Sequence, residues 1–182
     1  MDSVTTSPSS VLQGDQDRSS STWRNNQSCI AGVSRTYARC VSEAPGARRG
    51  RRKRWLVDGM NVIGSRPDRW WNDPDRAVRR FIDELVDYAG ATGDEVVVVF
   101  DRQPRDVTAG TRGPIEVMFA SRTGRNAADH DIAELVAKAE SPETITVVTS
   151  DRALADRIKQ RGARLASAGS FRRRMDATRD AR

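Results

Sequence analysis

The chain has 182 residues, enough for one ordinary domain, and carries 31 Lys and Arg against 25 Asp and Glu, a net charge of +6. One histidine and two cysteines exclude a four-ligand Cys/His zinc site, a scaffold of several disulfides and a nuclease mechanism that needs two histidines. No apolar stretch approaches the roughly 18 residues of a membrane span. None in the first 54 residues is long enough for the core of a signal peptide, so we expect a cytoplasmic protein.

The first 54 residues differ in composition from the rest of the chain. They hold 10 basic and 4 acidic residues, whereas residues 55–182 hold 21 of each. They are also rich in Ser and Thr and poor in apolar residues, which predicts a disordered basic arm. The arm ends in an arginine-rich run at residues 48–54, which is either an element that binds RNA or the ribosome or a solvated linker. A third alternative is that the true start lies downstream, which would make part of the segment an artefact.

From residue 55 onward, apolar runs without alternation predict strands covered on both faces, and amphipathic segments predict helices. Asp73 followed by Pro74 is typical of a helix start, and Gly90, Gly93 and Gly162 are typical of helix ends. In chain order the expected elements are a strand at 55–57, a helix at 74–90, strands at 95–100 and 115–119, a helix at 126–139, a strand at 144–149, a helix at 152–161 and a strand at 163–166. This order predicts a three-layer α/β domain over residues 55–175 with a mainly parallel sheet, followed by a tail at 176–182.

The three strongest strands share one feature, because an aspartate ends or closely follows each of them: Asp58, Asp101 and Asp151. In an open parallel sheet the carboxyl ends of the strands meet at one edge, where ligands bind. Carboxylates gathered there raise one another's pKa unless a cation lies between them. Oxygen donors without His or Cys indicate Mg²⁺ or Mn²⁺. A single aspartate after a strand is often only a helix cap, but three in succession favour a shared site.

Two further aspartates lie near the start of the helix expected at 126–139. On a helical wheel Asp129 and Asp131 lie roughly 70° and 90° from the centre of the apolar stripe, on opposite sides. Either residue could join the site, and both could instead be first-turn charges that the helix dipole favours. His130, between them, points away from the core and is expected at the surface.

Other polar and aromatic residues near the strand ends have two interpretations each. Asn61 either caps a turn or binds a phosphate, and Ser150 either caps a helix or holds a water at the metal. Trp70 and Trp71 fit partly packed hydrophobes better than a platform for stacked bases. Because a neutral domain with an acidic cleft repels RNA, local cations must attract it. The candidates are Arg102, Arg125, Arg152 and the run at residues 172–174.

Four segments, taken in order and with their spacing, resemble the YacP-like NYN family of PIN-fold ribonucleases. They are Val57-Asp58-Gly59-Met60-Asn61-Val62-Ile63-Gly64, Val98-Val99-Phe100-Asp101, Asn126-Ala127-Ala128-Asp129 and Val148-Thr149-Ser150-Asp151-Arg152. The resemblance covers residues 55–175. The family usually has Tyr where Met60 stands and an acidic residue where His130 stands.

The resemblance implies a metal-dependent endoribonuclease that hydrolyses RNA phosphodiester bonds, in some relatives on ribosome-associated mRNA. It implies the strand order 3-2-1-4-5. It also places the metal ligands at Asp58, Asp129 and Asp151, with Asp101 completing the acidic cluster, and so favours Asp129 over Asp131.

Three other classes of protein are alternatives to a nuclease. A non-catalytic RNA- or ribosome-binding protein of the same fold would carry the same carboxylates. A phosphotransfer protein is disfavoured, because phosphatases of the haloacid dehalogenase type need Asp-x-Asp after the first strand, and Gly59-Met60 follows Asp58. A dinucleotide-binding enzyme is disfavoured as well, because no Gly-x-Gly-x-x-Gly follows a strand.

Overall fold

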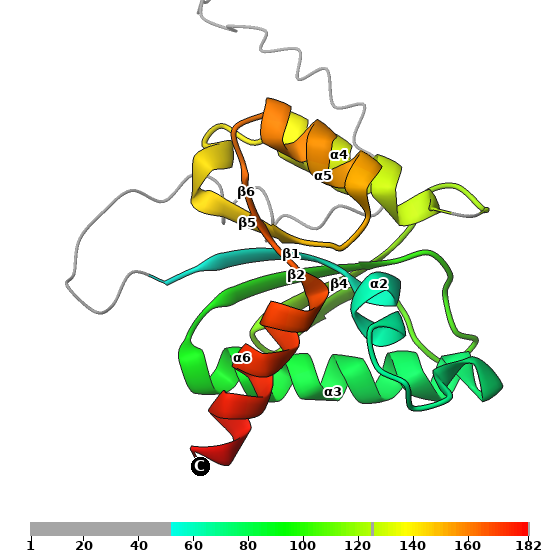
Figure 1. The fold of residues 1–182 in the computed structure, drawn as a ribbon. Helices are drawn as coiled ribbons and strands as arrows, with labels where there is room; N and C mark the ends of the chain where they lie inside the picture. The colour runs from blue at the N-terminus through cyan, green and yellow to red at the C-terminus, as the bar shows by residue number, and fades with distance from the viewer. Residues whose placement is uncertain (1–51, 125, 182) are drawn as a thin grey trace, which may run out of the picture.

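The computed structural model describes residues 52–124 and 126–181, so the arm predicted at residues 1–54 lies almost wholly outside the described residues, as does Arg125. Six strands form one sheet in the order β3-β4-β2-β1-β5-β6 (Figure 1). The strands are β1 (Arg54–Asp58), β2 (Glu95–Phe100), β3 (Gly110–Arg112), β4 (Ile115–Phe119), β5 (Ile145–Val148) and β6 (Arg164–Ala166).

Helices cover both faces of the sheet, which confirms the predicted three-layer α/β fold. They are α2 (Gly59–Gly64), α3 (Pro74–Thr92), α4 (Ala127–Ala137), α5 (Arg152–Gln160) and α6 (Ala168–Asp180), with short 3₁₀ turns at Trp70–Asn72 and Pro142–Thr144. In Figure 1, α3 and α6 lie below the sheet and α4 and α5 lie above it. Within the described residues, no helix combines the length and the apolar character that crossing a bilayer requires.

The sheet is parallel except at one edge. Strand β1 is central and pairs in parallel with β2 and β5, while β4 and β6 extend the sheet on either side. The five expected strands therefore take the order 3-2-1-4-5, as the resemblance implied. The added strand is β3, which runs antiparallel to β4 through three residues and lacks the apolar run that would have predicted it.

Two hydrophobic cores lie on the two faces of the sheet. Successive residues of β1 point to opposite faces, so Val57 packs on the α3 side and Leu56 on the side of α4 and α5. The core on the α3 side contains Phe81, Phe100 and Phe171, which are fully buried. Because both faces are covered, β1 and β2 have continuous apolar sequences rather than alternating ones.

Helix α3 begins where the sequence predicts and ends slightly later. The Asp73 carboxylate accepts a hydrogen bond from Arg76 N at 2.9 Å, which caps the first turn. Gly93 ends the helix with φ of 69°, a left-handed conformation that glycine adopts without a steric penalty. The prediction that Gly90 closes the helix is wrong, because the helix continues through it to Thr92.

Helices α2 and α6 were not predicted from the sequence. Helix α2 is only six residues long and follows β1 without an intervening loop. Helix α6 extends to Asp180, so most of the expected tail at 176–182 is helical. Its sequence is highly charged, but Phe171 and Met175 pack in the core, and the buried Arg172 guanidinium pairs with the Glu84 carboxylate at 2.5 Å.

Candidate active site

The topology brings the predicted aspartates to one edge of the sheet. Asp58 is the last residue of the central strand β1, and Asp101 directly follows β2, the neighbour of β1 on one side. Asp151 follows β5, the neighbour on the other side, and Asp129 lies in the first turn of α4. Because β2, β1 and β5 are parallel and adjacent, their carboxyl ends lie together.

Asp58 is the most buried of these carboxylates, with 5% of the residue exposed. Its Oδ1 accepts a hydrogen bond from Asn61 N at 3.1 Å, and its Oδ2 accepts one from the Thr149 hydroxyl at 3.3 Å. Burial raises the pKa of Asp58 from 3.8 to about 7; the negative charges of Asp129 and Asp101 act in the same direction, and the two hydrogen bonds oppose them. Asp58 is therefore a poor anion unless positive charge is brought to it.

Asp129 responds to the same group of charges. Burial raises its pKa from 3.8 to about 6, the charges of Asp151 and Asp101 add to the increase, and the charge of Arg157 opposes it. Within residues 52–124 and 126–181, no group hydrogen-bonds to the Asp129 carboxylate. The four aspartates are thus electrostatically coupled, as side chains gathered at one edge must be.

Asp101 and Asp151 each hold the start of a helix with one oxygen. Asp101 Oδ1 accepts a hydrogen bond from Ala128 N at 2.9 Å and so fixes the first turn of α4 to the end of β2. Asp151 Oδ1 accepts one from Leu154 N at 2.8 Å and caps α5. A carboxylate has two oxygens with about four acceptor positions, so capping leaves the second oxygen available to a ligand. The capping and shared-site interpretations of these residues are therefore compatible.

The structure gives Asp129 and Asp131 different roles, a distinction that the helical wheel did not make. Asp131 is 2% exposed, and its two oxygens accept hydrogen bonds from Ser121 N at 2.6 Å and from the Ser121 hydroxyl at 2.8 Å. Asp131 therefore anchors the segment that follows β4, while Asp129 belongs to the acidic group. The His130 side chain is partly exposed, with Nε2 3.8 Å from the Glu134 carboxylate.

The carboxylates differ from a preformed metal cage in their spacing. Among the described residues, the three side chains whose potential ligand atoms all lie within 4.8 Å of one another are His130, Asp131 and Glu134. In that trio, Ser121 occupies both Asp131 oxygens and Lys138 pairs with Glu134. The four strand-end aspartates supply the hard oxygen donors that Mg²⁺ and Mn²⁺ prefer, but side chains must rotate for three of them to share one ion.

Polar residues beside the aspartates connect the strand ends to one another. Asn61 Oδ1 accepts a hydrogen bond from Ser150 N at 3.0 Å, and the Ser150 hydroxyl accepts one from Ala168 N at 3.3 Å. Both predicted residues therefore have structural partners at the edge of the sheet. Sequence reasoning missed Thr149, whose hydroxyl donates to Asp58 and accepts from Asp151 N at 3.0 Å. The available signal was its place as the first polar residue after the last apolar pair of β5.

The predicted RNA-binding arginines have different surroundings. Arg102 pairs with Asp75 at 2.6 Å, whereas the exposed Arg152 has no carboxylate within ion-pairing distance in the described part of the chain. Sequence reasoning also missed Arg157, whose charge acts on Asp129. Trp70 packs against the core, as a partly packed hydrophobe does, whereas Trp71 is 58% exposed and does not fit that interpretation.

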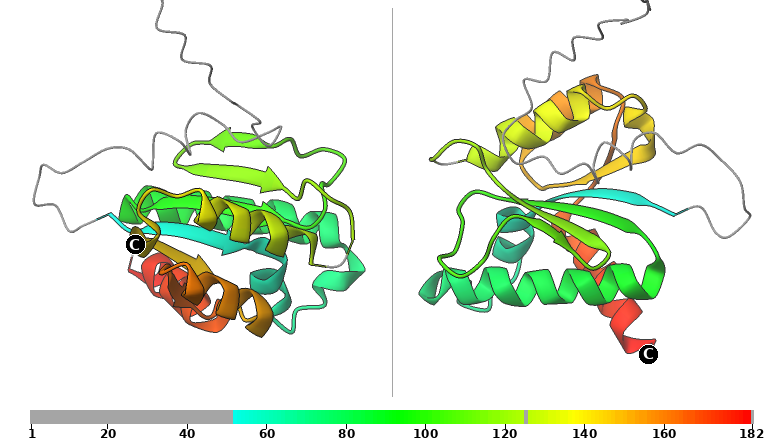
Figure 2. Two further views of the ribbon diagram at one scale, coloured as in Figure 1. Left: turned by 90° about the horizontal axis from the view of Figure 1, so that it is seen from above. Right: turned by 180° about the vertical axis from the view of Figure 1, so that it is seen from behind.

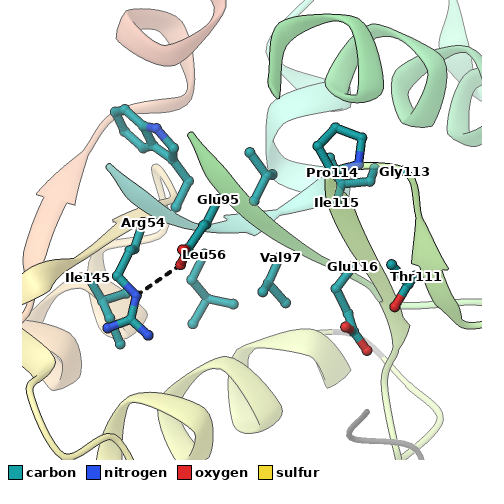
Figure 3. Close-up of a pocket in the computed structure, with 12 residues that line it drawn as sticks. Arg54, Leu56, Glu95, Val97, Thr111, Gly113, Pro114, Ile115, Glu116 and Ile145 are labelled. Carbon is teal, nitrogen blue, oxygen red and sulfur yellow. Dashed lines mark ion pairs between the residues drawn. The ribbon is translucent and has the colours of Figure 1, made fainter. Parts of the chain in front are cut away.

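A separate pocket lies at the opposite edge of the sheet (Figure 3). Its lining includes the first residues of four strands: Arg54, Glu95, Ile115 and Ile145. Arg54 Nε lies 3.3 Å from the Glu95 carboxylate, and the cavity has a volume of about 80 Å³ with mainly apolar walls. None of the strand-end aspartates lines it. The pocket and the acidic group are therefore two distinct features at the two ends of the strands.

The fold and the site together define an α/β domain with interacting carboxylates at the carboxyl edge of a mainly parallel sheet. Residues 55–182 match the YacP-like NYN domain, and the chain belongs to that family, whose members are generally ribonucleases. The predicted resemblance is thus confirmed at the level of the family.

Solved structures of a relative support the same assignment. The crystal structure of a point mutant of Rae1 (YacP) from Bacillus subtilis is 30% identical, covers 71% of this chain and 78% of its own, and superposes with a TM-score of 0.58. A further crystal structure of Rae1 (YacP) from Bacillus subtilis is 28% identical, covers 71% and 76% of the two chains, and has a TM-score of 0.59. A comparison with curated proteins gave no significant match.

Proposed function

We propose that this protein is a metal-dependent endoribonuclease that hydrolyses RNA phosphodiester bonds at the carboxyl edge of its sheet. The observation that carries the proposal is the gathering of Asp58, Asp101, Asp129 and Asp151 at one edge of the sheet, where burial and, after it, their mutual repulsion raise the pKa of Asp58 and of Asp129. Like charges gathered in a partly buried place are costly, and a cation bound between them would offset that cost. Membership of the NYN family supports the nuclease class.

The chemistry of the donors fits Mg²⁺ or Mn²⁺, and we assign Asp58, Asp129 and Asp151 as ligands, with Asp101 completing the negative group. A bound divalent cation supplies neutralisation of phosphate charge and activation of water for in-line hydrolysis. The protein fixes the donors from several elements: Asp58 is held by Thr149 and by Asn61 N, and Asp151 is held by the first turn of α5. Capping engages one oxygen of Asp151, whereas each Asp58 oxygen accepts one hydrogen bond and keeps a second acceptor position for a ligand.

The test is cleavage of an end-labelled RNA by the purified chain with Mn²⁺ or with EDTA. We expect cleavage in Mn²⁺ and none in EDTA, and we expect Asp58→Asn to lose at least about 100-fold in rate because the amide is neutral and a weaker ligand. Asp83→Asn is the matched control, because Asp83 is an exposed acid on α3, away from the strand ends. Full activity of folded Asp58→Asn would remove Asp58 from the mechanism.

The second candidate is a non-catalytic protein of the same fold that binds RNA or the ribosome. The spacing of the aspartates favours it, because among the described residues no three of them meet within 4.8 Å. This candidate predicts RNA binding, or co-sedimentation with ribosomes, that EDTA does not alter, with no cleavage in Mn²⁺ or Mg²⁺. Cleavage that the Asp58→Asn substitution abolishes would exclude it.

A further inference from the structure

The folded part of the chain is electrically neutral, but its charges are divided between its two ends. Residues 55–150 hold 11 basic and 17 acidic residues, a net charge of −6, and residues 151–182 hold 10 basic and 4 acidic residues, a net charge of +6. The second segment forms α5, β6 and α6, and β6 is the edge strand of the sheet. In the left view of Figure 2 these orange and red elements lie on the side away from the green strands β3 and β4, with α5 and α6 on opposite faces of the sheet (Figure 1).

At the basic end Arg172, Arg174 and Arg179 are paired with carboxylates, but other arginines are not. Five are exposed and have no carboxylate within 4.0 Å among the residues that the structure describes: Arg152, Arg157, Arg161, Arg164 and Arg173. Two arginines of α3 are neutralised, because Arg79 pairs with Asp106 at 2.8 Å and Arg80 pairs with Asp68, whereas the exposed Arg76 of the same helix has no carboxylate within 4.0 Å among the described residues. A guanidinium without a carboxylate partner keeps its full capacity for bidentate bonds to phosphate.

The unpaired arginines of α5 begin at the acidic edge. Arg152 directly follows Asp151, and Arg157 is close enough to lower the pKa of Asp129. Arg161, the residue that ends α5, lies only about 40° from Arg157 around the helix axis, whereas Arg152, in the first turn, lies about 140° from Arg157. At about 1.5 Å per residue, Arg152 and Arg161 are separated by about 14 Å along the helix axis. The arginines therefore extend from the acidic group along one helix.

We propose that single-stranded RNA leaves the acidic edge past Arg152, in the first turn of α5, and continues over the side of the helix that Arg157 and Arg161 share. The proposal rests on the function proposed above and assigns the binding surface to the β6 end of the molecule rather than the β3 end. The acidic group repels a polyanion, so the bound strand must be held by cations immediately beside it. Arg102 follows Asp101 at the end of β2 and is already paired with Asp75. It therefore contributes less to holding the RNA.

Binding is measured separately from cleavage in the full-length Asp58→Asn chain. The ligand is a fluorescein-labelled 20-nucleotide single-stranded RNA in EDTA, titrated by anisotropy at several salt concentrations. We expect Arg152→Ala with Arg157→Ala to weaken binding at least tenfold at 0.1 M salt. The slope of log affinity against log salt should fall by about 1.4, which is about 0.7 for each lost phosphate contact. Circular dichroism melts verify that the variants are folded.

The matched control is Arg79→Ala with Arg80→Ala, which removes the same charge from arginines that are paired with aspartates. We expect less than a twofold change in affinity. Equal weakening by both pairs would show that net charge alone matters, and an unchanged affinity in the Arg152 and Arg157 variant would place the RNA elsewhere; either result overturns the proposal. Because the assay contains no cleavage step, it is independent of whether Asp58→Asn abolishes catalysis.

Discussion

Asp58 combines two roles in one side chain. It caps α2 by accepting a bond from Asn61 N, as an aspartate at a helix start often does, and it is also the buried member of the acidic group. The sequence alone left these interpretations as alternatives. The structure shows that capping uses Oδ1, while Thr149 contacts Oδ2, so local structure and a shared site depend on the same carboxylate.

The raised pKa of Asp58 makes the stability of the metal-free protein depend on pH. Unfolded, Asp58 loses its proton near 3.8, whereas folded it keeps the proton up to about 7. Its contribution to stability is therefore complete below about pH 4 and is lost as the pH rises from about 4 through 7, an effect on the order of a few kcal/mol. Asp129, with a pKa of about 6, acts in the same direction. We expect Asp58→Asn to melt higher than the parent at pH 8 in EDTA and about equally at pH 4.

The comparison uses differential scanning fluorimetry of the parent, Asp58→Asn and Asp83→Asn in EDTA. Other groups also titrate in this range, so the difference between variants at each pH is the relevant quantity. Adding Mn²⁺ at pH 8 should raise the melting temperature of the parent much more than that of Asp58→Asn, because a cation bound only by the folded state stabilises it. A melting difference between parent and Asp58→Asn that is the same at pH 4 and pH 8 would contradict the assigned burial of this carboxylate.

Thr149 shows what a sequence pattern does not reveal about a residue. Its hydroxyl lies between Asp58 Oδ2 and Asp151 N, and so connects two strand ends that are 93 residues apart in the chain. In the sequence it is one polar residue in a short run of polar residues after β5. The same holds for Asn61, whose bond to Ser150 N depends on the parallel pairing of β1 and β5. Contacts of this kind follow from topology rather than from residue type.

Among the elements, the close contact of α2 with β2 positions the two aspartates that follow their strands. A Cβ built on Gly59 would lie 2.4 Å from Phe100 Cδ1 and Cε1, and the Phe100 ring is fully buried. Gly59 follows Asp58 and Phe100 precedes Asp101, so this contact determines how near those carboxylates lie. Only a residue without a Cβ permits it.

We predict that Gly59→Ala destabilises the protein by about 1–3 kcal/mol, because the added methyl group forces the ring or the helix to move. Chemical unfolding in urea measures the change. Gly90→Ala is the matched control, because Gly90 is exposed within α3 and nothing lies within 4 Å of its built Cβ. We expect this control to stabilise the protein by about 0.5–1 kcal/mol. Equal effects of the two substitutions would show that the contact with Phe100 is not tight.

The elements that could be predicted from the sequence are those whose apolar residues follow a regular period. The apolar runs of β1, β2 and β5 and the stripe of α3 fall in this class, and the aspartates after those strands followed from them. Helix α6 was missed because Phe171 and Met175 are separated by charged residues, one of which, Arg172, is buried only because Glu84 lies on α3. Helix α2 and strand β3 are too short to establish a period.

At the scale of the whole molecule, the two ends of the parallel strands carry different structural features. The carboxyl ends carry the acidic group, and the amino ends carry the pocket of Figure 3 and the point where residues 1–51 join β1. That junction is held by Asp94, which accepts hydrogen bonds from Lys53 N at 3.0 Å, Trp55 Nε1 at 2.9 Å and the Tyr88 hydroxyl at 2.9 Å. Burial raises the pKa of Tyr88 to about 12, so this hydroxyl remains a donor at physiological pH.

This arrangement predicts what deletion of residues 1–51 does. The deletion retains Lys53 and therefore every bond to Asp94 described above, and both hydrophobic cores consist of described residues beyond position 54. We expect the melting temperature to change little. Residues 1–51 hold seven basic and four acidic residues, so we expect the shortened chain to bind single-stranded RNA more weakly and with a smaller salt dependence.

Anisotropy titrations and thermal melts of the two chains decide between the interpretations of the arm. Weaker binding with an unchanged melting temperature supports an element that attracts RNA, and unchanged binding supports a linker. A large drop in melting temperature would contradict the prediction, because it would mean that residues before 52 complete the fold. A chain without the arm that still loses affinity on substitution of Arg152 and Arg157 would show that the β6 end binds RNA by itself, since in the described part of the chain those arginines have no acidic partners to release.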